Sequence, residues 1–119
     1  MKDVKIAVAQ FEPKDGDKDY NLSRIDHLTK KAKDGGADII SFHEMSITAY
    51  TFFKNLDRDQ VCELAEEVPN GSSCQKLIDI STKYDIPILA GLVERCDDEI
   101  FNTYVCVDGS RVIAKYRKT

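Results

Sequence analysis

The segment Asp38-Ile39-Ile40-Ser41-Phe42-His43-Glu44 decides the fold class, because it reads as a short buried strand that ends at two polar side chains. An earlier segment, Val4–Gln10, is rich in β-branched residues and apolar on both faces toward its end. Such a strand is expected to be covered on both sides, as in α/β sheets. Between the two, apolar residues recur at helical spacing from about Asn21, and Gly35-Gly36 follows them. We therefore predict a β-α-β unit with parallel strands and a right-handed crossover.

Two more helices and a third strand are expected downstream. A helix is predicted over Asp57–Glu67, and Pro69-Asn70-Gly71 separates it from another helix. Ser72 or Ser73 is a suitable N-cap for that later helix, because a hydroxyl oxygen accepts from the free amides of the first turn. The strongly apolar segment Ile86–Val93 predicts a central strand.

The last part of the chain indicates antiparallel strands. Ile100–Val107 and Arg111–Tyr116 flank Asp108-Gly109, which is a strong hairpin signal. The predicted fold class is therefore α/β with a mixed sheet, parallel first and antiparallel toward the end. Because the predicted helices suffice for only one face of this sheet, we expect a partner chain or a second half of the domain to cover the other face.

The composition narrows the class of protein. The 119 residues correspond to one domain or part of one, and 42% hydrophobic with 32% charged residues is ordinary for a globular protein. No apolar run approaches the roughly 20 residues of a membrane span, and the N-terminus lacks a signal-peptide core, so we expect a cytoplasmic protein with no membrane partner. The net charge of −4 argues against nucleic-acid binding.

Two charged residues at predicted strand ends are the candidates for chemistry. Glu44 follows a buried strand, where a carboxylate can be partly withdrawn from water and serve as a general base. Lys118 ends the last strand, where an ammonium can stabilise an oxyanion. Taken alone, each also fits a structural role, as a loop carboxylate bound to backbone amides and as an exposed lysine beside Arg117. Together they are two of the three groups that a thiol needs to hydrolyse a carbon–nitrogen bond.

The cysteines and histidines offer no comparable site. The chain contains no C-x-x-C pair, and we expect reduced thiols that do not act as nucleophiles. His43 and Glu44 are neighbours on an extended segment and point to opposite faces, so a metal site is not expected. The four cysteines are Cys62, Cys74, Cys96 and Cys106.

Six segments, in this order, resemble the nitrilase or carbon–nitrogen hydrolase superfamily. They are Lys5–Gln10, Ala37–Tyr50, Ile88–Glu94, Phe101–Thr103, Asp108-Gly109 and Ala114–Thr119. The resemblance implies part of an α-β-β-α sandwich, with Glu44 as the general base and Lys118 as the catalytic lysine. It also implies a nucleophilic cysteine beyond position 119, so residues 1–119 are expected to be the N-terminal portion of the domain and inactive alone. His43 and Ala49 depart from the family, which more often has proline and glycine there.

The implied activity is hydrolysis of a non-peptide carbon–nitrogen bond through a thiol acyl-enzyme, by an amidase rather than a nitrilase. The expected substrate is a small amide, nitrile or carbamoyl compound, no cofactor or metal is required, and the protein is expected to be a homo-oligomer. Two other interpretations remain open. A short non-catalytic relative could serve as a binding or assembly module, with Glu44 and Lys118 as a buried ion pair. A nucleotide-binding α/β domain is disfavoured, because no G-x-G-x-x-G or P-loop follows Gln10.

Overall fold

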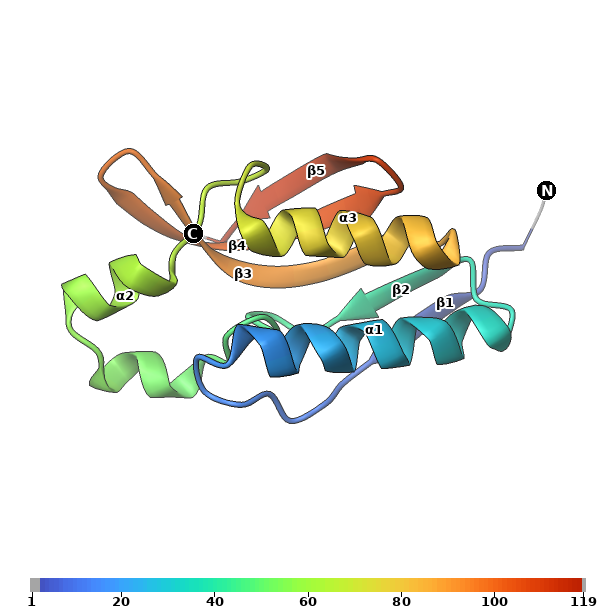
Figure 1. Cartoon of the computed structure of the whole chain (residues 1–119), viewed down its shortest axis with the longest axis horizontal. Helices are drawn as coiled ribbons and strands as arrows, with labels where there is room; N and C mark the ends of the chain where they lie inside the picture. Colours follow the sequence, from blue (N-terminus) through green and yellow to red (C-terminus); the bar gives the residue numbers. More distant parts are fainter. Residues whose placement is uncertain (1–2, 119) are drawn as a thin grey trace.

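Five strands and two long helices dominate the computed structural model of the chain, which describes residues 3–118 (Figure 1). In chain order the elements are β1 (Ile6–Ala9), α1 (Lys18–Asp34), β2 (Ile39–Phe42), the 3₁₀ helix η1 (Thr51–Asn55), α2 (Arg58–Leu64), α3 (Ser72–Tyr84), β3 (Ile88–Cys96), β4 (Glu99–Asp108) and β5 (Arg111–Arg117).

The strands lie in one sheet in their sequence order, β1-β2-β3-β4-β5. The first three are parallel, with Ala7 opposite Ile40 and Ile40 opposite Ile88. The β3–β4 and β4–β5 pairs are antiparallel, with Leu92 opposite Thr103 and Thr103 opposite Arg117. The predicted mixed sheet is therefore confirmed, and its parallel half comes from the β-α-β unit.

Helix α1 begins earlier than the sequence pattern predicted. The Asp17 carboxylate accepts from the Tyr20 amide at 3.0 Å and starts the helix at Lys18. Asn21 is fully buried, and its Nδ2 donates to the carbonyls of Lys14 and Ile47, both at 2.9 Å. The side chain at the predicted start thus joins the β1–α1 loop to the segment after β2.

The helices α2 and α3 differ from prediction for tertiary reasons. Helix α2 ends at Leu64 rather than near Glu67, because the chain then runs along β3: the Glu66 amide donates to the Val93 carbonyl at 3.0 Å. The N-cap of α3 is Gly71, not a serine. A distant carboxylate replaces the expected hydroxyl, since Glu66 Oε1 accepts from the Ser73 amide at 2.7 Å.

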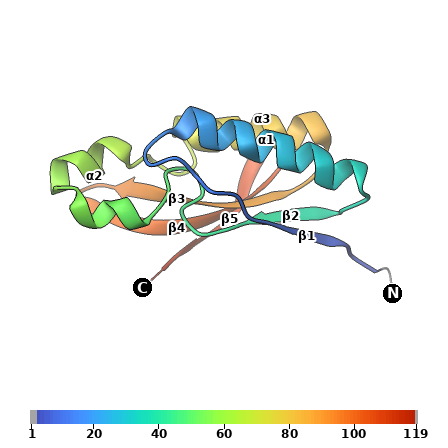
Figure 2. The same ribbon diagram turned by 90° about the horizontal axis from the view of Figure 1, so that it is seen from below.

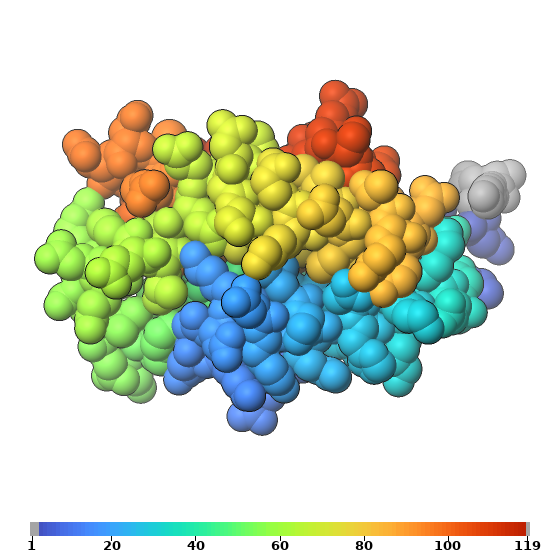
Figure 3. All heavy atoms as spheres, in the orientation of Figure 1, coloured from blue at the N-terminus to red at the C-terminus, as the bar shows by residue number. Residues whose placement is uncertain are grey.

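The core lies between the sheet and the helices α1 and α3, which lie on the same face (Figure 2) and side by side in the surface view (Figure 3). Ile25, Leu77 and Ile88 are completely buried there. The opposite face is open within residues 3–118: Ile6 and Val8 of β1 are 60% and 79% exposed. The prediction that β1 is covered on both sides is therefore wrong for the described residues. Separately, no helix in this range is long and apolar enough to cross a bilayer.

Candidate active site

The two predicted charged residues meet at one end of the sheet. The Lys118 Nζ atom lies 3.2 Å from both carboxylate oxygens of Glu44, although the residues are 74 positions apart in the chain. Glu44 follows the end of β2, and Lys118 follows the last residue of β5. Both side chains reach solvent, with 40% of Glu44 and 54% of Lys118 exposed. The site is therefore an accessible ion pair rather than a buried one.

Asn102 of β4 completes this contact, and the sequence analysis did not single it out as a site residue. Its Nδ2 donates to Glu44 Oε1 at 2.7 Å, while its carbonyl accepts from the Lys118 amide at 2.8 Å. One residue thus orients the carboxylate and fixes the backbone that carries the lysine. The Phe101-Asn102-Thr103 segment contained the only signal, as one of the family-like segments.

Close packing on β3 determines where the Glu44 backbone lies. A Cβ atom at Gly91 would lie 2.4 Å from the Met45 amide nitrogen and 3.1 Å from Glu44 Cα. The segment is also bonded to this glycine, since the Ile47 amide donates to the Gly91 carbonyl at 3.1 Å. Ala49, where the family often has glycine, has a φ of 70°, in the left-handed region that glycine adopts without strain.

Replacing Gly91 with alanine is expected to lower the free energy of unfolding by about 2 kcal/mol or more, because the new methyl group would displace backbone rather than a flexible side chain. Urea unfolding at pH 7 measures this effect. Gly35→Ala is the matched control: its Cβ would meet the Lys31 and Ala32 carbonyl oxygens at 3.4 and 3.6 Å, and we expect a change below about 1 kcal/mol. Equal unfolding midpoints for the two variants would contradict the close approach at Gly91.

Two cavities share Glu44. One, of about 430 Å³, lies at the ion pair and is lined by Phe42, Glu44, Asn102, Tyr104, Tyr116 and Lys118. The other, of about 440 Å³, is lined by Gln10, Phe11, Glu12, Pro13, Asp15, His43, Glu44, Ala49, Tyr50 and Thr51. Apolar walls around a few convergent polar groups are typical of sites for small molecules. No cysteine of residues 3–118 lines either cavity.

A tyrosine fixes the wall of the first cavity. The Tyr104 hydroxyl lies 2.8 Å from Ser41 Oγ and donates to the Phe42 carbonyl, so that it joins β4 to the end of β2. Burial raises the pKa of Tyr104, which keeps the phenol protonated at neutral pH. Tyr104 is therefore a structural donor beside the ion pair.

His43 borders the second cavity and has no polar partner. Both of its ring nitrogens are buried without a hydrogen bond within the described residues, and its ring centroid lies 5.1 Å from that of Phe11. Burial lowers the pKa of His43, so the imidazole is neutral at pH 7. Nowhere in residues 3–118 do three or more histidine, cysteine or acidic side chains gather in a way that could hold a metal ion.

The four cysteines are all free thiols, and none lies at the ion pair. Cys74 is a fully buried residue of α3, and burial raises its pKa to about 11. Burial also raises the pKa of Cys106 on β4, whereas Cys62 is half-buried and Cys96 is exposed. A thiol with a raised pKa is a poor nucleophile at neutral pH, which agrees with the expectation for Cys74 and Cys106.

A second charged cluster lies on the covered face of the sheet. The Glu94 side chain is 1% exposed and accepts from Lys115 Nζ at 2.7 Å, Arg117 Nε at 2.8 Å and Thr103 Oγ1 at 2.7 Å. Burial alone would raise the pKa of Glu94, but the hydrogen bonds from Arg117, Lys115 and Thr103 outweigh it and lower the pKa to about 2. The sequence analysis placed Glu94 only within a family-like segment and assigned it no partner.

Acid is expected to destabilise the protein through Glu94. Its pKa is about 2 in the folded chain against an ordinary value of 4.5, so the unfolded chain binds the proton more readily. The contribution of Glu94 to stability is therefore complete above pH 4.5 and is lost as the pH falls toward 2. Urea unfolding between pH 6 and 2 measures this loss. Glu94→Gln should be less stable at pH 6 and should show a flatter pH dependence; identical slopes would contradict the assignment.

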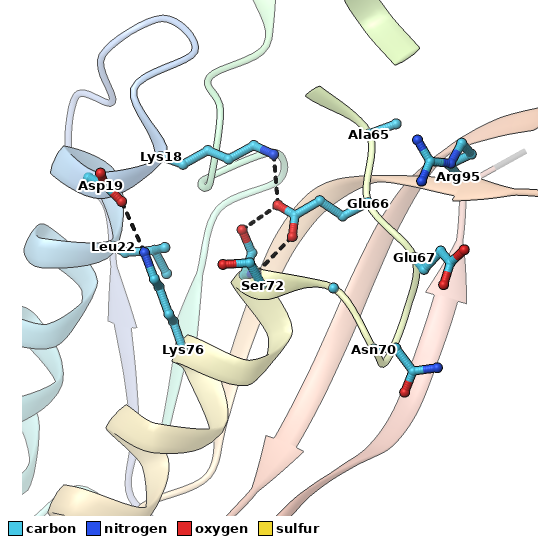
Figure 4. A pocket seen from close by; sticks show the side chains of 12 residues that line it. Lys18, Asp19, Leu22, Ala65, Glu66, Glu67, Asn70, Ser72, Lys76 and Arg95 are labelled. Atoms are coloured by element: carbon cyan, nitrogen blue, oxygen red, sulfur yellow. Dashed lines mark hydrogen bonds and ion pairs between the residues drawn. The ribbon is translucent and has the colours of Figure 1, made fainter. Parts of the chain in front are cut away.

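A third cavity, of about 560 Å³, lies elsewhere, between the start of α1 and the N-terminus of α3 (Figure 4). Glu66 points into it, pairing with Lys18 Nζ at 2.8 Å and capping the Ser73 amide at 2.7 Å. Burial would raise the pKa of Glu66, but its bonds to Lys18 and Ser73 outweigh burial and lower the pKa. Because the chain's own carboxylate occupies this helix end, the contacts are those of a structural cap.

Comparison with known proteins identifies the family. The profile of the carbon-nitrogen hydrolase family matches residues 5–119, and the chain therefore belongs to this family, within the nitrilase superfamily. A nitrilase from Pyrococcus abyssi is 33% identical over 97% of this chain and 43% of its own length. An (R)-stereoselective amidase from a Pseudomonas species is 27% identical over 98% of this chain and 40% of its own length.

The fold agrees with this assignment. The crystal structure of an N-terminal amidase superposes with a TM-score of 0.81 and 26% identity, over 98% of this chain and 28% of that one. The chain thus spans less than half of the length of each of these three relatives.

Proposed function

We propose that this chain provides the general base, Glu44, and the oxyanion-stabilising lysine, Lys118, of an amidase-type carbon–nitrogen hydrolase. The observation that carries the proposal is the contact of Lys118 Nζ with both Glu44 oxygens, at 3.2 Å, on the wall of an open cavity. Carboxylate and ammonium therefore face one space in which a small substrate could lie between them and a thiol.

The exposure of the ion pair supports a chemical role over a structural one. Pairs between solvent-exposed charges typically contribute only about 0–1 kcal/mol, because water screens them and both side chains lose freedom. Glu44 and Lys118 are 40% and 54% exposed, so holding the fold together does not explain their convergence. The alternative of a non-catalytic module expected a buried pair, whereas within residues 3–118 the pair is exposed.

In the proposed reaction Glu44 takes the proton of a cysteine thiol, and the resulting thiolate attacks the amide carbon. The oxygen of the tetrahedral species becomes negative, and Lys118 stabilises it. The carbon–nitrogen bond then breaks, and the nitrogen leaves as ammonia or an amine with the proton that Glu44 held. Water, deprotonated in turn by Glu44, attacks the thioester and releases the carboxylic acid and the thiol. None of these steps requires a metal or an organic cofactor.

The cysteine of this reaction is proposed to lie outside residues 1–119, which would then be the N-terminal portion of a longer domain. The support is that the relatives are more than twice as long as the matched segment, and that neither cavity at Glu44 is lined by a described cysteine. The open apolar face of the sheet fits this proposal, because an α-β-β-α sandwich would cover it. A second copy of the protein in a homo-oligomer is the other expected cover.

The test is ammonia release by the natural protein that contains this sequence, measured with a panel of small amides and nitriles. We expect an intact mass more than twice the 13.4 kDa of this chain, turnover of at least one amide, and loss of turnover after thiol alkylation. Protection by substrate during alkylation distinguishes a site thiol from a remote one. A protein of 13.4 kDa that releases no ammonia would favour the binding or assembly module instead.

A further inference from the structure

The end of β5 presents different residues to the two faces of the sheet. Lys115 and Arg117 contact Glu94 on the face covered by α1 and α3, whereas Tyr116 and Lys118 line the cavity at Glu44 on the other face. This follows from the alternation of side chains along a strand. The two charged clusters are therefore separate in space but share one backbone segment, Lys115–Lys118.

Glu94 connects that segment to the centre of the sheet. It lies on β3, two strands away from β5, and its carboxylate accepts from Lys115 Nζ, Arg117 Nε and Arg117 Nη2 at 2.7, 2.8 and 3.0 Å. The Arg117 guanidinium also lies over the Phe101 ring, 4.1 Å from its centroid. Charge-assisted and two-pronged bonds of this kind fix geometry more strongly than neutral ones.

The segment has few other restraints. Within residues 3–118, β5 is at the edge of the sheet, and none of its residues is buried. Its pairing with β4 ends at Thr103–Arg117, followed by a single backbone bond from the Lys118 amide to the Asn102 carbonyl at 2.8 Å. Strand ends with little burial and exposed hydrogen bonds open readily, so the side-chain bonds to Glu94 are the main anchor of this end.

We propose that Glu94 is a positioning residue that holds the end of β5 so that Lys118 stays against Glu44. Neutralising Glu94 removes the partner of two cations on the covered face, and Lys115 and Arg117 then turn toward water and take the strand end with them. The consequence of this placement for catalysis rests on the function proposed above. The placement itself can be measured without any turnover.

The experiment is NMR at pH 7 on the natural protein that contains this sequence, with two signals. The first is the ¹³C chemical shift of the Glu44 carboxyl group. The Lys118→Met variant, which lacks the ammonium group, gives the reference value of this shift for an unpaired Glu44. We expect Glu94→Gln to move this resonance at least half of the way to the Lys118→Met value. The second is hydrogen exchange of the Lys118 amide, which we expect to become about tenfold faster or more.

Two further variants guard against a simple loss of stability. Asp26→Asn removes another carboxylate, on α1 and paired with Lys83 of α3 at 2.6 Å, and it should leave both signals at the wild-type values. Arg117→Gln keeps the Glu94–Lys115 pair and acts at a residue that is 34% exposed, so it should fold even if Glu94→Gln does not. It should shift both signals in the same direction as Glu94→Gln.

The outcomes separate this inference from the proposed function. If Arg117→Gln, and Glu94→Gln where it folds, leave the Glu44 resonance and the Lys118 exchange rate unchanged, Glu94 does not position the lysine, whatever the enzyme does. The inference is equally wrong if Asp26→Asn moves the signals as far. If the signals move as expected but turnover of the natural protein survives Glu44→Gln, the positioning stands and the proposed function falls.

Discussion

Replacing Glu44 with glutamine is expected to lower kcat of the natural protein by about 10³-fold or more, since general-base catalysis typically contributes 10²–10⁴-fold. Glutamine keeps the shape of the side chain and an oxygen that can accept from Asn102 Nδ2, but it cannot take a proton from a thiol or from water. The same group serves both half-reactions of the proposed mechanism, so acylation and deacylation should slow together. Ammonia release measures acylation, and formation of the carboxylic acid measures deacylation.

The fold should survive this change. The Glu44–Lys118 pair is exposed, and we expect its loss to alter the free energy of unfolding by less than about 1 kcal/mol. Glu63→Gln, on the exposed side of α2, is the matched control and should keep wild-type turnover. A Glu44→Gln protein that folds and retains a tenth of the wild-type kcat would remove Glu44 from the mechanism.

Replacing Lys118 with alanine is expected to lower kcat by about 10²–10³-fold, the usual effect of removing one group that stabilises an oxyanion. The effect should fall on kcat more than on KM, because the charge that Lys118 meets develops only in the tetrahedral species. Lys118→Arg should recover only part of the rate, since a guanidinium keeps the charge but places its donors differently.

An exposed lysine elsewhere provides the comparison. Lys30 pairs with Asp34 on the surface of α1 with 61% of its side chain exposed, and Lys30→Ala should leave kcat unchanged. If Lys118→Ala raised KM while kcat stayed constant, the lysine would bind substrate without stabilising the transition state. That result would keep Lys118 in the site and change its role.

The sequence predicted the parts of the fold that depend on local pattern. The β-α-β unit and the hairpin at Asp108-Gly109 follow from hydrophobic period and turn chemistry, and both are confirmed. Strand ends and a family resemblance together pointed to Glu44 and Lys118, which the structure brings into contact. Their catalytic roles stay a proposal until turnover is measured.

Other features depend on contacts between distant segments, and the sequence could not supply them. Alternation of residue types predicts which face of the sheet a side chain takes, but the partners of Glu94 and Asn102 also depend on how β3, β4 and β5 are aligned along their length. The need for glycine at position 91 comes from the backbone of Glu44 and Met45, which passes close to it, and no local pattern in the sequence reveals this contact. Likewise, apolar residues on both faces of β1 indicate that burying both faces is favourable, but they do not indicate which segment packs against the second face.

The two cavities that meet at Glu44 bear on the order of events in the proposed reaction. One carboxylate must meet a thiol first and a water molecule later, with an amine departing in between. Apart from Glu44 the two cavities have different lining residues, with Lys118 in one and His43 in the other, so within residues 3–118 the proposed base can be reached through two openings. In the proposed reaction we expect the amine to depart through one opening and water to arrive through the other.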